Sequence, residues 1–230
     1  MQSRTGTKKI VASISCIKHR RHNLYAVLQS VVLQCDSVIL HLDFKPAADE
    51  LPNTDKLTVY THYSQTSEIR TIDAALNADT YYFMIDDDII YPANYMNTMI
   101  SMLNAYNNKP ILCVHGSIID FKKNDNWYHD RTVFHFASEL YESKIVNVPG
   151  AGTSCFYTGS FTPDIYMNLN MTDIQIARQA KINNIPILCI NRALYWLKPI
   201  DNSGECIYGN TGFYEKRNKY IHDNIEVFQS

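Results

Sequence analysis

Three consecutive carboxylates, Asp86, Asp87 and Asp88, directly follow a short apolar segment, residues 81–85. That segment is predicted to be a buried strand, and ligands of open α/β sheets bind beyond the carboxyl ends of strands. Adjacent carboxylates repel one another unless a cation or hydrogen bonds compensate. Mg²⁺ and Mn²⁺ accept carboxylate ligands and bridge to phosphates. We therefore expect Asp86 and Asp88 to bind such a metal ion, whereas a solvated acidic turn is the plainer interpretation.

Apolar segments of strand length alternate with amphipathic segments of helix length along the chain. The predicted strands cover residues 9–17, 37–42, 56–63, 81–85, 111–115, 145–148, 153–157 and 187–190. The predicted helices start at Asn23 and Pro92 or cover residues 68–77, 172–183 and 213–230. Such alternation is typical of an α/β domain. We therefore expect a mixed, mostly parallel sheet flanked by helices, with the acidic triplet at one strand end.

The charge balance excludes some partners, because 21 Lys and Arg residues face 23 Asp and Glu residues, a net charge of −2. A balanced charge gives no general affinity for nucleic acid. The six cysteines lie mostly in apolar runs without metal-binding spacing, which predicts buried thiols in a reducing compartment. No signal peptide or apolar run of roughly 20 residues is found. We expect a cytoplasmic protein without a transmembrane segment, and peripheral association with the inner membrane face stays open.

Residues 81–95, YYFMIDDDIIYPANY, resemble the DxD segment of GT-A glycosyltransferases similar to family 2, especially those of bacterial surface and capsular polysaccharide synthesis. The resemblance extends more weakly over residues 8–200. It implies the GT-A (Rossmann-like) fold and metal-dependent transfer of a sugar from a nucleotide-sugar donor to a saccharide acceptor, with Mn²⁺ or Mg²⁺. We accordingly expect a nucleotide-sugar-binding catalytic domain at 1–200 and a C-terminal loop and tail at 201–230.

The resemblance implies donor-binding roles for residues around the first two strands and the helix before the DxD. Ser15 lies where the first strand opens the nucleotide site, and Arg20 follows it. Asp43 ends the second strand, where related enzymes carry an acid that contacts the base. Arg70 matches the arginine that reaches the base or the diphosphate. A basic turn, a loop acid and a surface ion pair are the plainer interpretations of Arg20, Asp43 and Arg70, respectively.

The resemblance also implies different roles for the three residues of the acidic triplet. Asp86 matches the acid that contacts ribose or sugar, Asp88 matches the metal ligand, and Asp87 joins the donor-binding set without a defined role. Gly152 belongs to the segment 150–153, where related enzymes place a glycine-containing loop against the sugar. Small residues let the backbone approach a ligand closely. A tight hairpin between two strands is the plainer interpretation of this segment.

Asp173 is the expected catalytic base. Residues 172–175, TDIQ, have the form of a capping box that opens a helix, and related enzymes carry their base at such a helix start. An inverting transfer needs a base that removes the proton of the acceptor hydroxyl as it attacks the anomeric carbon. Thr172 replaces the Glu of the commoner Glu-Asp pair. An acid in a helix's first turn is also stabilised by the helix dipole without any catalytic role.

Further residues and functions stay open at this level. His115 ends a predicted strand and is either a polar site residue or a structural histidine. Trp196, Lys198 and the segment up to Asn210 are a candidate lid over the diphosphate, and Tyr128 is a candidate exposed ring for stacking on sugars. A sugar nucleotidyltransferase would need a G-x-G-x-R loop after the first strand, which is lacking. A non-catalytic nucleotide-sugar or carbohydrate-binding domain is the other alternative.

Overall fold

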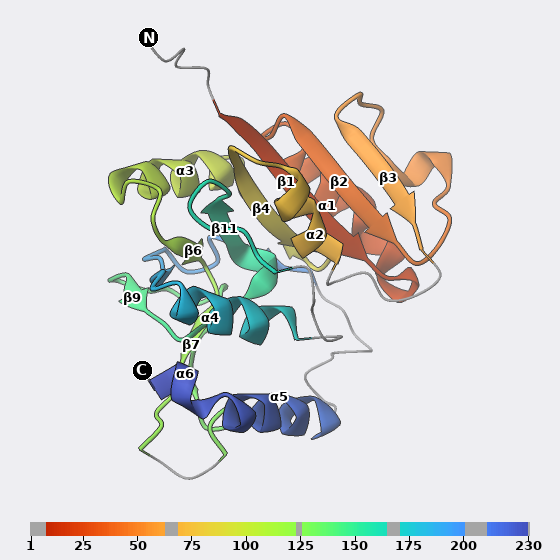
Figure 1. Ribbon diagram of the computed structural model, residues 1–230. Helices are drawn as coiled ribbons and strands as arrows, with labels where there is room; N and C mark the ends of the chain where they lie inside the picture. Colours follow the sequence, from red (N-terminus) through yellow and green to blue (C-terminus); the bar gives the residue numbers. More distant parts are fainter. Residues whose placement is uncertain (1–7, 63–68, 123–125, 165–170, 201–210, 230) are drawn as a thin grey trace.

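A computed structural model describes residues 8–62, 69–122, 126–164, 171–200 and 211–229 (Figure 1). Its centre is an eight-stranded sheet with the order β3-β2-β1-β4-β11-β6-β12-β9. The parallel half consists of β1 (Lys9–Cys16), β2 (Ser37–Leu42), β3 (Leu57–Thr61) and β4 (Thr80–Asp86). Their carboxyl ends meet at one edge of the sheet, because parallel strands share a direction.

The other half of the sheet is mixed. β11 (Ser154–Tyr157) runs antiparallel to both β4 and β6 (Ile111–Cys113), and β12 (Ile187–Cys189) is parallel to β6. β9 (Lys144–Ile145) completes the edge in antiparallel orientation. The predicted α/β class with a mixed, mostly parallel sheet flanked by helices is thus confirmed.

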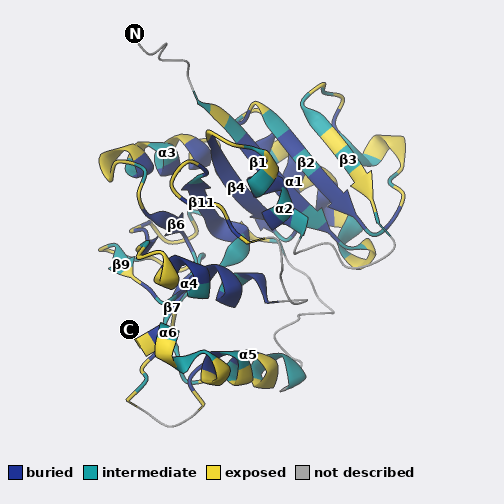
Figure 2. Ribbon diagram, viewed as in Figure 1, coloured by how far each residue is buried: buried dark blue, intermediate teal, exposed yellow. Residues whose placement is uncertain are grey.

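Helices cover both faces of the sheet. Successive residues of β1 point to opposite faces, so Ile14 belongs to one hydrophobic core and Val11 to the other. The core around Ile14 receives α1 (Leu24–Val31) and α3 (Tyr95–Ala105). The core around Val11 receives α2 (Ile69–Leu76) and α4 (Thr172–Ile182). Figure 2 shows β1 and β4 buried between these layers.

Short antiparallel ladders extend this framework near the carboxyl edge. A three-stranded sheet has the order β10-β7-β8, formed by β7 (Gly116–Ile118), β8 (Thr132–Phe134) and β10 (Val148–Pro149). A two-stranded ribbon joins β5 (Ile89–Ile90) to β13 (Lys198–Pro199). The single strand expected at 145–148 is therefore two strands, β9 and β10, which belong to different sheets.

The C-terminal residues form two helices where one was expected, α5 (Thr211–Asp223) and α6 (Ile225–Gln229). They lie beside α4, at the end of the molecule away from β3 (Figure 1). Ile221 and Phe228 are buried in the same core as Ile174 of α4. In the described part of the chain, each helix is too short or too polar to cross a lipid bilayer.

Two helix starts differ from the expectation. A 3₁₀ turn, η1 (Lys18–Asn23), precedes α1, and the buried Asn23 makes no capping bond through its side chain. In α4 the N-cap residue is Met171, so Thr172 is already helical and no capping box forms. The side-chain oxygen of Thr172 is buried without a partner in the described chain. Asp173 therefore lies in the first helical turn for reasons other than a capping box.

The prediction of buried thiols is confirmed for the five cysteines that the structure describes. Cys16, Cys35, Cys113, Cys155 and Cys189 are buried free thiols. Cys206 lies outside the described residues. The five described thiols fill space as small apolar side chains within the two cores.

Candidate active site

The acidic triplet sits at the carboxyl edge of the parallel strands, as expected. Asp86 is the last residue of β4 and lies opposite Ser15 of β1 in the strand register. The side chains of Asp86 and Asp88 are 39% and 29% exposed, whereas that of Asp87 is 6% exposed. The two outer carboxylates are therefore open to a ligand, and the middle one is turned into the protein.

Arg20 neutralises part of this charge. Its Nη1 lies 2.9 Å from an oxygen of Asp87 and 2.9 Å from an oxygen of Asp88. The second oxygen of Asp87 accepts the backbone N–H of Ile17 at 3.3 Å. Burial raises the pKa of Asp87 above its ordinary value, against the opposing effect of Arg20. Arg20, which is half-buried, and the buried Asp87 thus form an ion pair that fixes η1 beside the triplet.

Asp88 keeps an excess of negative charge around it. Burial first, and then repulsion by Asp86, raise the pKa of Asp88 from 3.8 to about 7. Arg20 acts in the opposite direction without cancelling these effects. A carboxyl group in this position is stabilised by a further cation. This charge state is the first observation that fits a divalent ion at Asp86 and Asp88.

Arg70 holds Asp86 from the other side. Its guanidinium is buried, and Nη1 donates to the backbone oxygen of Ile85 at 2.8 Å and to Oδ1 of Asp86 at 2.9 Å. Asp73, also in α2, is not its partner and bonds to His41 of β2 at 2.6 Å. Arg70 therefore orients a donor-site carboxylate, and α2 is the element that places it there.

Gly152, in the 3₁₀ turn η3 (Ala151–Thr153), lies very close to the side chain of Asp86. A Cβ atom at Gly152 would lie 1.7 Å from Cγ of Asp86, so the position has no room for a side chain. The hydroxyl of Tyr91 donates to the backbone oxygen of Gly152 at 2.5 Å and accepts the N–H of Asp86 at 3.0 Å. The segment 150–153 is not a hairpin, because its flanking strands lie in different sheets.

Tyr91 was missed by sequence reasoning. Its ring is buried between the triplet and α3, and its hydroxyl joins the end of β4 to η3. The only available signal was a tyrosine three residues after Asp88, just before Pro92. The surrounding apolar residues predict that this tyrosine is a buried core residue. They do not indicate that its hydroxyl forms hydrogen bonds.

Asp43 and Ser15, two of the predicted donor-binding residues, lie at the carboxyl ends of β2 and β1. Asp43 follows β2, and its Oδ1 accepts the backbone N–H of Lys18 at 2.6 Å. Ser15 is half-buried beside Asp86. The ends of β1, β2 and β4 therefore bring Ser15, Asp43 and Asp86 to one edge, although Asp43 already stabilises the start of η1.

Asp173 is held in an ion pair. Nη2 of Arg217 lies 3.1 Å from Oδ1 of Asp173, and Nε lies 3.4 Å from Oδ2. Tyr128 donates its hydroxyl to Oδ2 at 3.1 Å. Arg217 comes from α5, which sequence reasoning treated as a polar tail. These contacts join Asp173 to α5 and Tyr128, and Tyr128 itself is buried rather than exposed as expected.

His115 lies two residues after the end of β6 and contacts η3, the turn that contains Gly152. Its backbone N–H donates to the hydroxyl of Thr153 at 2.9 Å, and its Cβ would be 2.6 Å from a Cβ atom at Gly150. Burial, followed by the nearby His135 and two arginines, lowers the pKa of His115 to about 3. Its imidazole is therefore neutral near pH 7.

The candidate lid is described only at its base. Trp196 packs against Tyr95 of α3, with ring centroids 5.7 Å apart, and so belongs to the core. Lys198 is exposed in β13, and the N–H of Ile200 donates to the backbone oxygen of Asp88 at 2.8 Å. Residues 201–210 lie outside the described residues. The segment that leads into them is thus tied directly to the acidic triplet.

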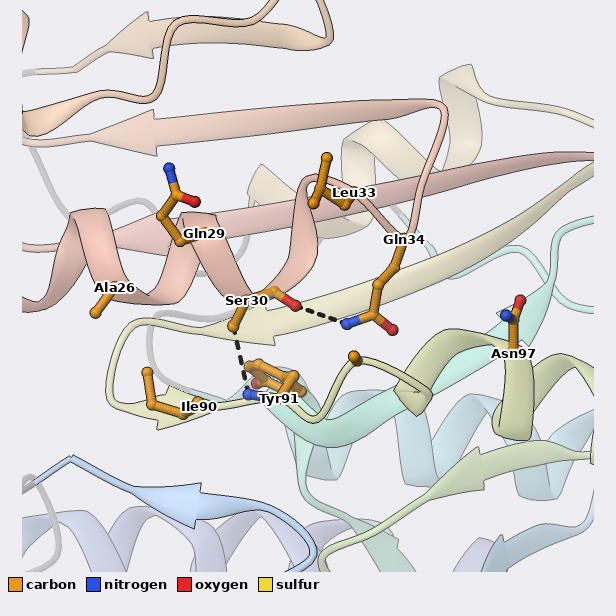
Figure 3. A pocket seen from close by; sticks show the side chains of 9 residues that line it. Ala26, Gln29, Ser30, Leu33, Gln34, Ile90, Tyr91 and Asn97 are labelled. Carbon is orange, nitrogen blue, oxygen red and sulfur yellow. Dashed lines mark hydrogen bonds between the residues drawn. The ribbon is translucent and has the colours of Figure 1, made fainter.

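A hollow of about 580 Å³ lies between α1 and the segment 90–97 (Figure 3). Ser30, Gln34 and Tyr91 line it, among others. Gln34 donates to the backbone oxygen of Ser30 at 2.6 Å, and the Tyr91 N–H donates to the Ser30 hydroxyl at 3.4 Å. Since these polar groups bond within the wall, they do not converge on a ligand in the way that a binding pocket requires.

The donor set at the triplet fits a hard divalent cation. Asp86 and Asp88 supply exposed carboxylate oxygens, which Mg²⁺ and Mn²⁺ prefer. Within the described ranges, no group of three or more His, Cys, Asp or Glu side chains is arranged to hold a metal ion. Mg²⁺ is commonly bound through one or two carboxylates plus substrate phosphates. Two protein carboxylates are therefore consistent with an ion that is completed by a phosphorylated ligand.

Comparisons with known proteins support the fold. No protein-family model matches the chain, and no curated protein matches it in sequence. Among solved structures, S. aureus TarS, a GT-A-like glycosyltransferase, matches with a TM-score of 0.53 at 12% identity. A second structure, of TarS residues 1–349, matches with a TM-score of 0.52 at 11% identity.

The two alignments cover most of this chain but only part of each TarS chain. Each alignment covers 80% of this chain, but only 36% of the first TarS chain and 59% of the second. At this identity the likeness concerns the fold alone. The chain has an α/β architecture with a large, mostly parallel sheet, and its structural neighbours of this fold are glycosyltransferases.

Proposed function

We propose that the protein is a metal-dependent glycosyltransferase that transfers a sugar from a nucleotide-sugar donor to a saccharide acceptor. One observation carries the proposal. Two partly exposed carboxylates lie at the carboxyl end of the central strand β4: Asp86, its last residue, and Asp88, two residues later. Arg70 and Gly152 both contact the carboxylate of Asp86 and restrict its position. The fold shared with TarS is consistent with this chemistry.

The chain's own residues prepare the donor site. Ser15 and Asp43 line the nucleotide side, and Arg70 fixes the direction of Asp86. Asp86 and Asp88 would hold Mn²⁺ or Mg²⁺, which stabilises the charge of the departing nucleoside diphosphate when bound. The exposed Lys198 lies in the strand paired with β5, next to the triplet, and adds positive charge on the phosphate side.

We further propose an inverting reaction in which Asp173 takes the proton of the acceptor hydroxyl. Arg217 and Tyr128 hold the carboxylate in one orientation. Each carboxylate oxygen has two lone-pair directions, so these bonds leave acceptor capacity on Asp173. Its side chain is 17% exposed, which leaves a path for a hydroxyl to reach it.

The first experiment measures donor turnover by the full chain with Mn²⁺ and with EDTA. Activity with Mn²⁺ and none with EDTA is expected. Asp88→Asn should lower turnover by about a hundredfold or more, since a catalytic metal contributes several kcal/mol. The matched control is Asp55→Asn, which changes an exposed carboxylate outside the site and should leave turnover unchanged. Undiminished transfer in EDTA would contradict the metal-dependent mechanism.

The role of Asp173 needs its own variant. Asp173→Asn keeps the shape of the side chain and should abolish transfer while donor binding, measured by calorimetry, stays close to the wild type. Transfer at the normal rate by this variant would refute its assignment as the base. The experiment also requires that the variant stays folded, which thermal unfolding checks.

One observation favours a second function, a non-catalytic nucleotide-sugar-binding domain. Both oxygens of Asp173 already accept bonds, from Arg217 and from Tyr128. These bonds occupy some of the acceptor positions that a base would use for the proton of the acceptor hydroxyl. Metal-dependent donor binding without any turnover, across a panel of UDP-, GDP-, CMP- and dTDP-sugars and saccharide acceptors, would favour this alternative.

A further inference from the structure

Two arginines, Arg131 and Arg192, have no carboxylate partner in the described part of the chain. Arg192 is 7% exposed, and its guanidinium donates to the backbone oxygens of Ile190 at 3.0 Å and His135 at 2.6 Å. Its Nε is buried without a partner among the described residues. Arg131 donates to the backbone oxygen of Tyr128 and stacks on its ring, with Cζ 3.8 Å from the centroid.

Four other described arginines have a carboxylate partner, whereas Arg178 donates to the side-chain oxygen of Asn224. Arg20, Arg21, Arg70 and Arg217 each form an ion pair with an aspartate or glutamate. A buried guanidinium without a counter-charge costs stability, because backbone oxygens replace water only in part. The positive charge at Arg131 and Arg192 is therefore suited to an anion supplied from outside.

Two histidines complete what we call the basic cluster: Arg131, Arg192, His115 and His135. The rings of His115 and His135 lie 5.4 Å apart. Nδ1 of the exposed His135 accepts the N–H of Ala137 at 3.2 Å, so Nε2 carries the proton of the neutral ring. In the described chain no protein group accepts that proton, and Nε2 is an available donor.

The basic cluster is continuous with the candidate active site. His115 bonds to Thr153 of η3, the same turn whose Gly152 touches Asp86. At the other end, Arg131 stacks on Tyr128, whose hydroxyl bonds to Asp173. Contacts thus run from the donor carboxylates to the cluster, and from the cluster to the proposed base.

We propose that the basic cluster binds an oxyanion, a phosphate or a carboxylate, that is carried by the saccharide acceptor. Guanidinium and imidazole N–H groups are the donors that recognise such oxyanions. The anion supplies the counter-charge that Arg131 and Arg192 lack within the described protein. The acceptor's identity as a saccharide rests on the proposed function, whereas the anion site does not.

Calorimetry on the full chain tests the site with defined probes. Glycerol 1-phosphate is compared with glycerol, and glucuronate with glucose, at low salt and with saturating nucleoside diphosphate and Mn²⁺ to fill the donor position. At least one anionic probe should bind about tenfold or more tightly than its neutral analogue. The stronger anionic probe identifies phosphate or carboxylate as the preferred group. Equal binding of charged and neutral probes would overturn the proposal.

Matched variants locate the binding. Arg131→Gln and His135→Gln change half-exposed and exposed residues and should each weaken the anionic probe about tenfold, with unchanged thermal midpoints. The control is Arg178→Gln, because Arg178 of α4 bonds to Asn224, which lies between α5 and α6, and is outside the cluster. Equal weakening in all three variants, or displacement of the probe by nucleoside diphosphate, would overturn the site.

A transfer assay separates this inference from the proposed function. Arg131→Gln should raise KM for an anionic acceptor about tenfold, with little change in kcat and no change for a neutral acceptor. If the wild type transfers no sugar but still binds the anionic probe through Arg131, the proposed function fails and the anion site stands. If it transfers sugar and the variant treats both acceptors alike, the anion site fails and the function stands.

Discussion

At the scale of single residues, the three neighbouring aspartates occupy three environments. Asp86 is oriented by Arg70, Asp87 is buried against Arg20, and Asp88 is partly exposed with a raised pKa. The difference follows from the alternation of a strand that is just ending, which turns the middle residue inward. The proposed metal site therefore uses the outer two carboxylates, Asp86 and Asp88.

A pH-dependence of stability follows from Asp88. Its pKa rises from 3.8 to about 7 on folding, so the folded state binds a proton that the unfolded state has lost between these values. Stability should therefore fall as the pH rises from about 4 to 7. The loss should be of the order of 2 kcal/mol between pH 5 and pH 8, because partial exposure weakens the effect.

Urea unfolding at the two pH values measures this loss, and Asp88→Asn should remove most of it. Mn²⁺ added at pH 8 should restore stability to the wild type and not to the variant, since a bound cation compensates the same charge. A variant with the same pH-dependence as the wild type would show that another group causes it.

Site residues could be predicted from the sequence where their position depends on neighbouring residues. They could not be predicted where they depend on a partner far away in the sequence. Asp86 and Asp88 follow a recognisable strand directly, so their position could be inferred from neighbouring residues. Arg217 pairs with Asp173 across 44 positions of sequence. Nothing in the polar pattern of residues 213–230 indicates that partner, because long-range pairing depends on how the helices pack.

At the scale of elements, the close contact with Asp86 requires a glycine at position 152 of the turn η3. A methyl group at Gly152 would collide with Asp86, so Gly152→Ala must move either the turn or the carboxylate. Overpacking of this kind costs about 1–3 kcal/mol. We expect lower stability in urea and weaker Mn²⁺-dependent donor binding by calorimetry. Ala151→Ser, in the same turn but half-buried, is the control and should change neither quantity.

Element type was easier to predict than element pairing. The parallel strands β1, β2 and β4 carry apolar runs that identify them, and α1 and α3 lie where helices were expected to start, at Asn23 and Pro92. β11 enters the sheet between β4 and β6 in antiparallel orientation, and residues 144–149 divide between two sheets. Strand direction and partner are set by the path of the intervening chain, which hydrophobic periodicity does not encode.

At the scale of the whole molecule, the C-terminal helices are part of the structure that surrounds Asp173. Arg217 of α5 is 5% exposed and pairs with Asp173, while Ile221 and Phe228 are buried beside α4. Their burial stabilises the fold by about 1.5–3 kcal/mol for each large apolar side chain. The expected division into a domain at 1–200 and a tail at 201–230 therefore makes a testable claim about independent folding.

Truncation tests that claim in two steps. A chain ending at Asp223 loses α6 with Phe228 and should show a lower thermal midpoint but still unfold cooperatively. A chain ending at Asn210 also loses Ile221 and leaves Asp173 without Arg217, which adds the cost of an uncompensated, largely buried charge, about 3 kcal/mol. We expect this chain to lack a cooperative transition in calorimetry and to aggregate. If it instead unfolds like the full chain, α5 and α6 are dispensable, and residues 1–200 form the folding unit by themselves.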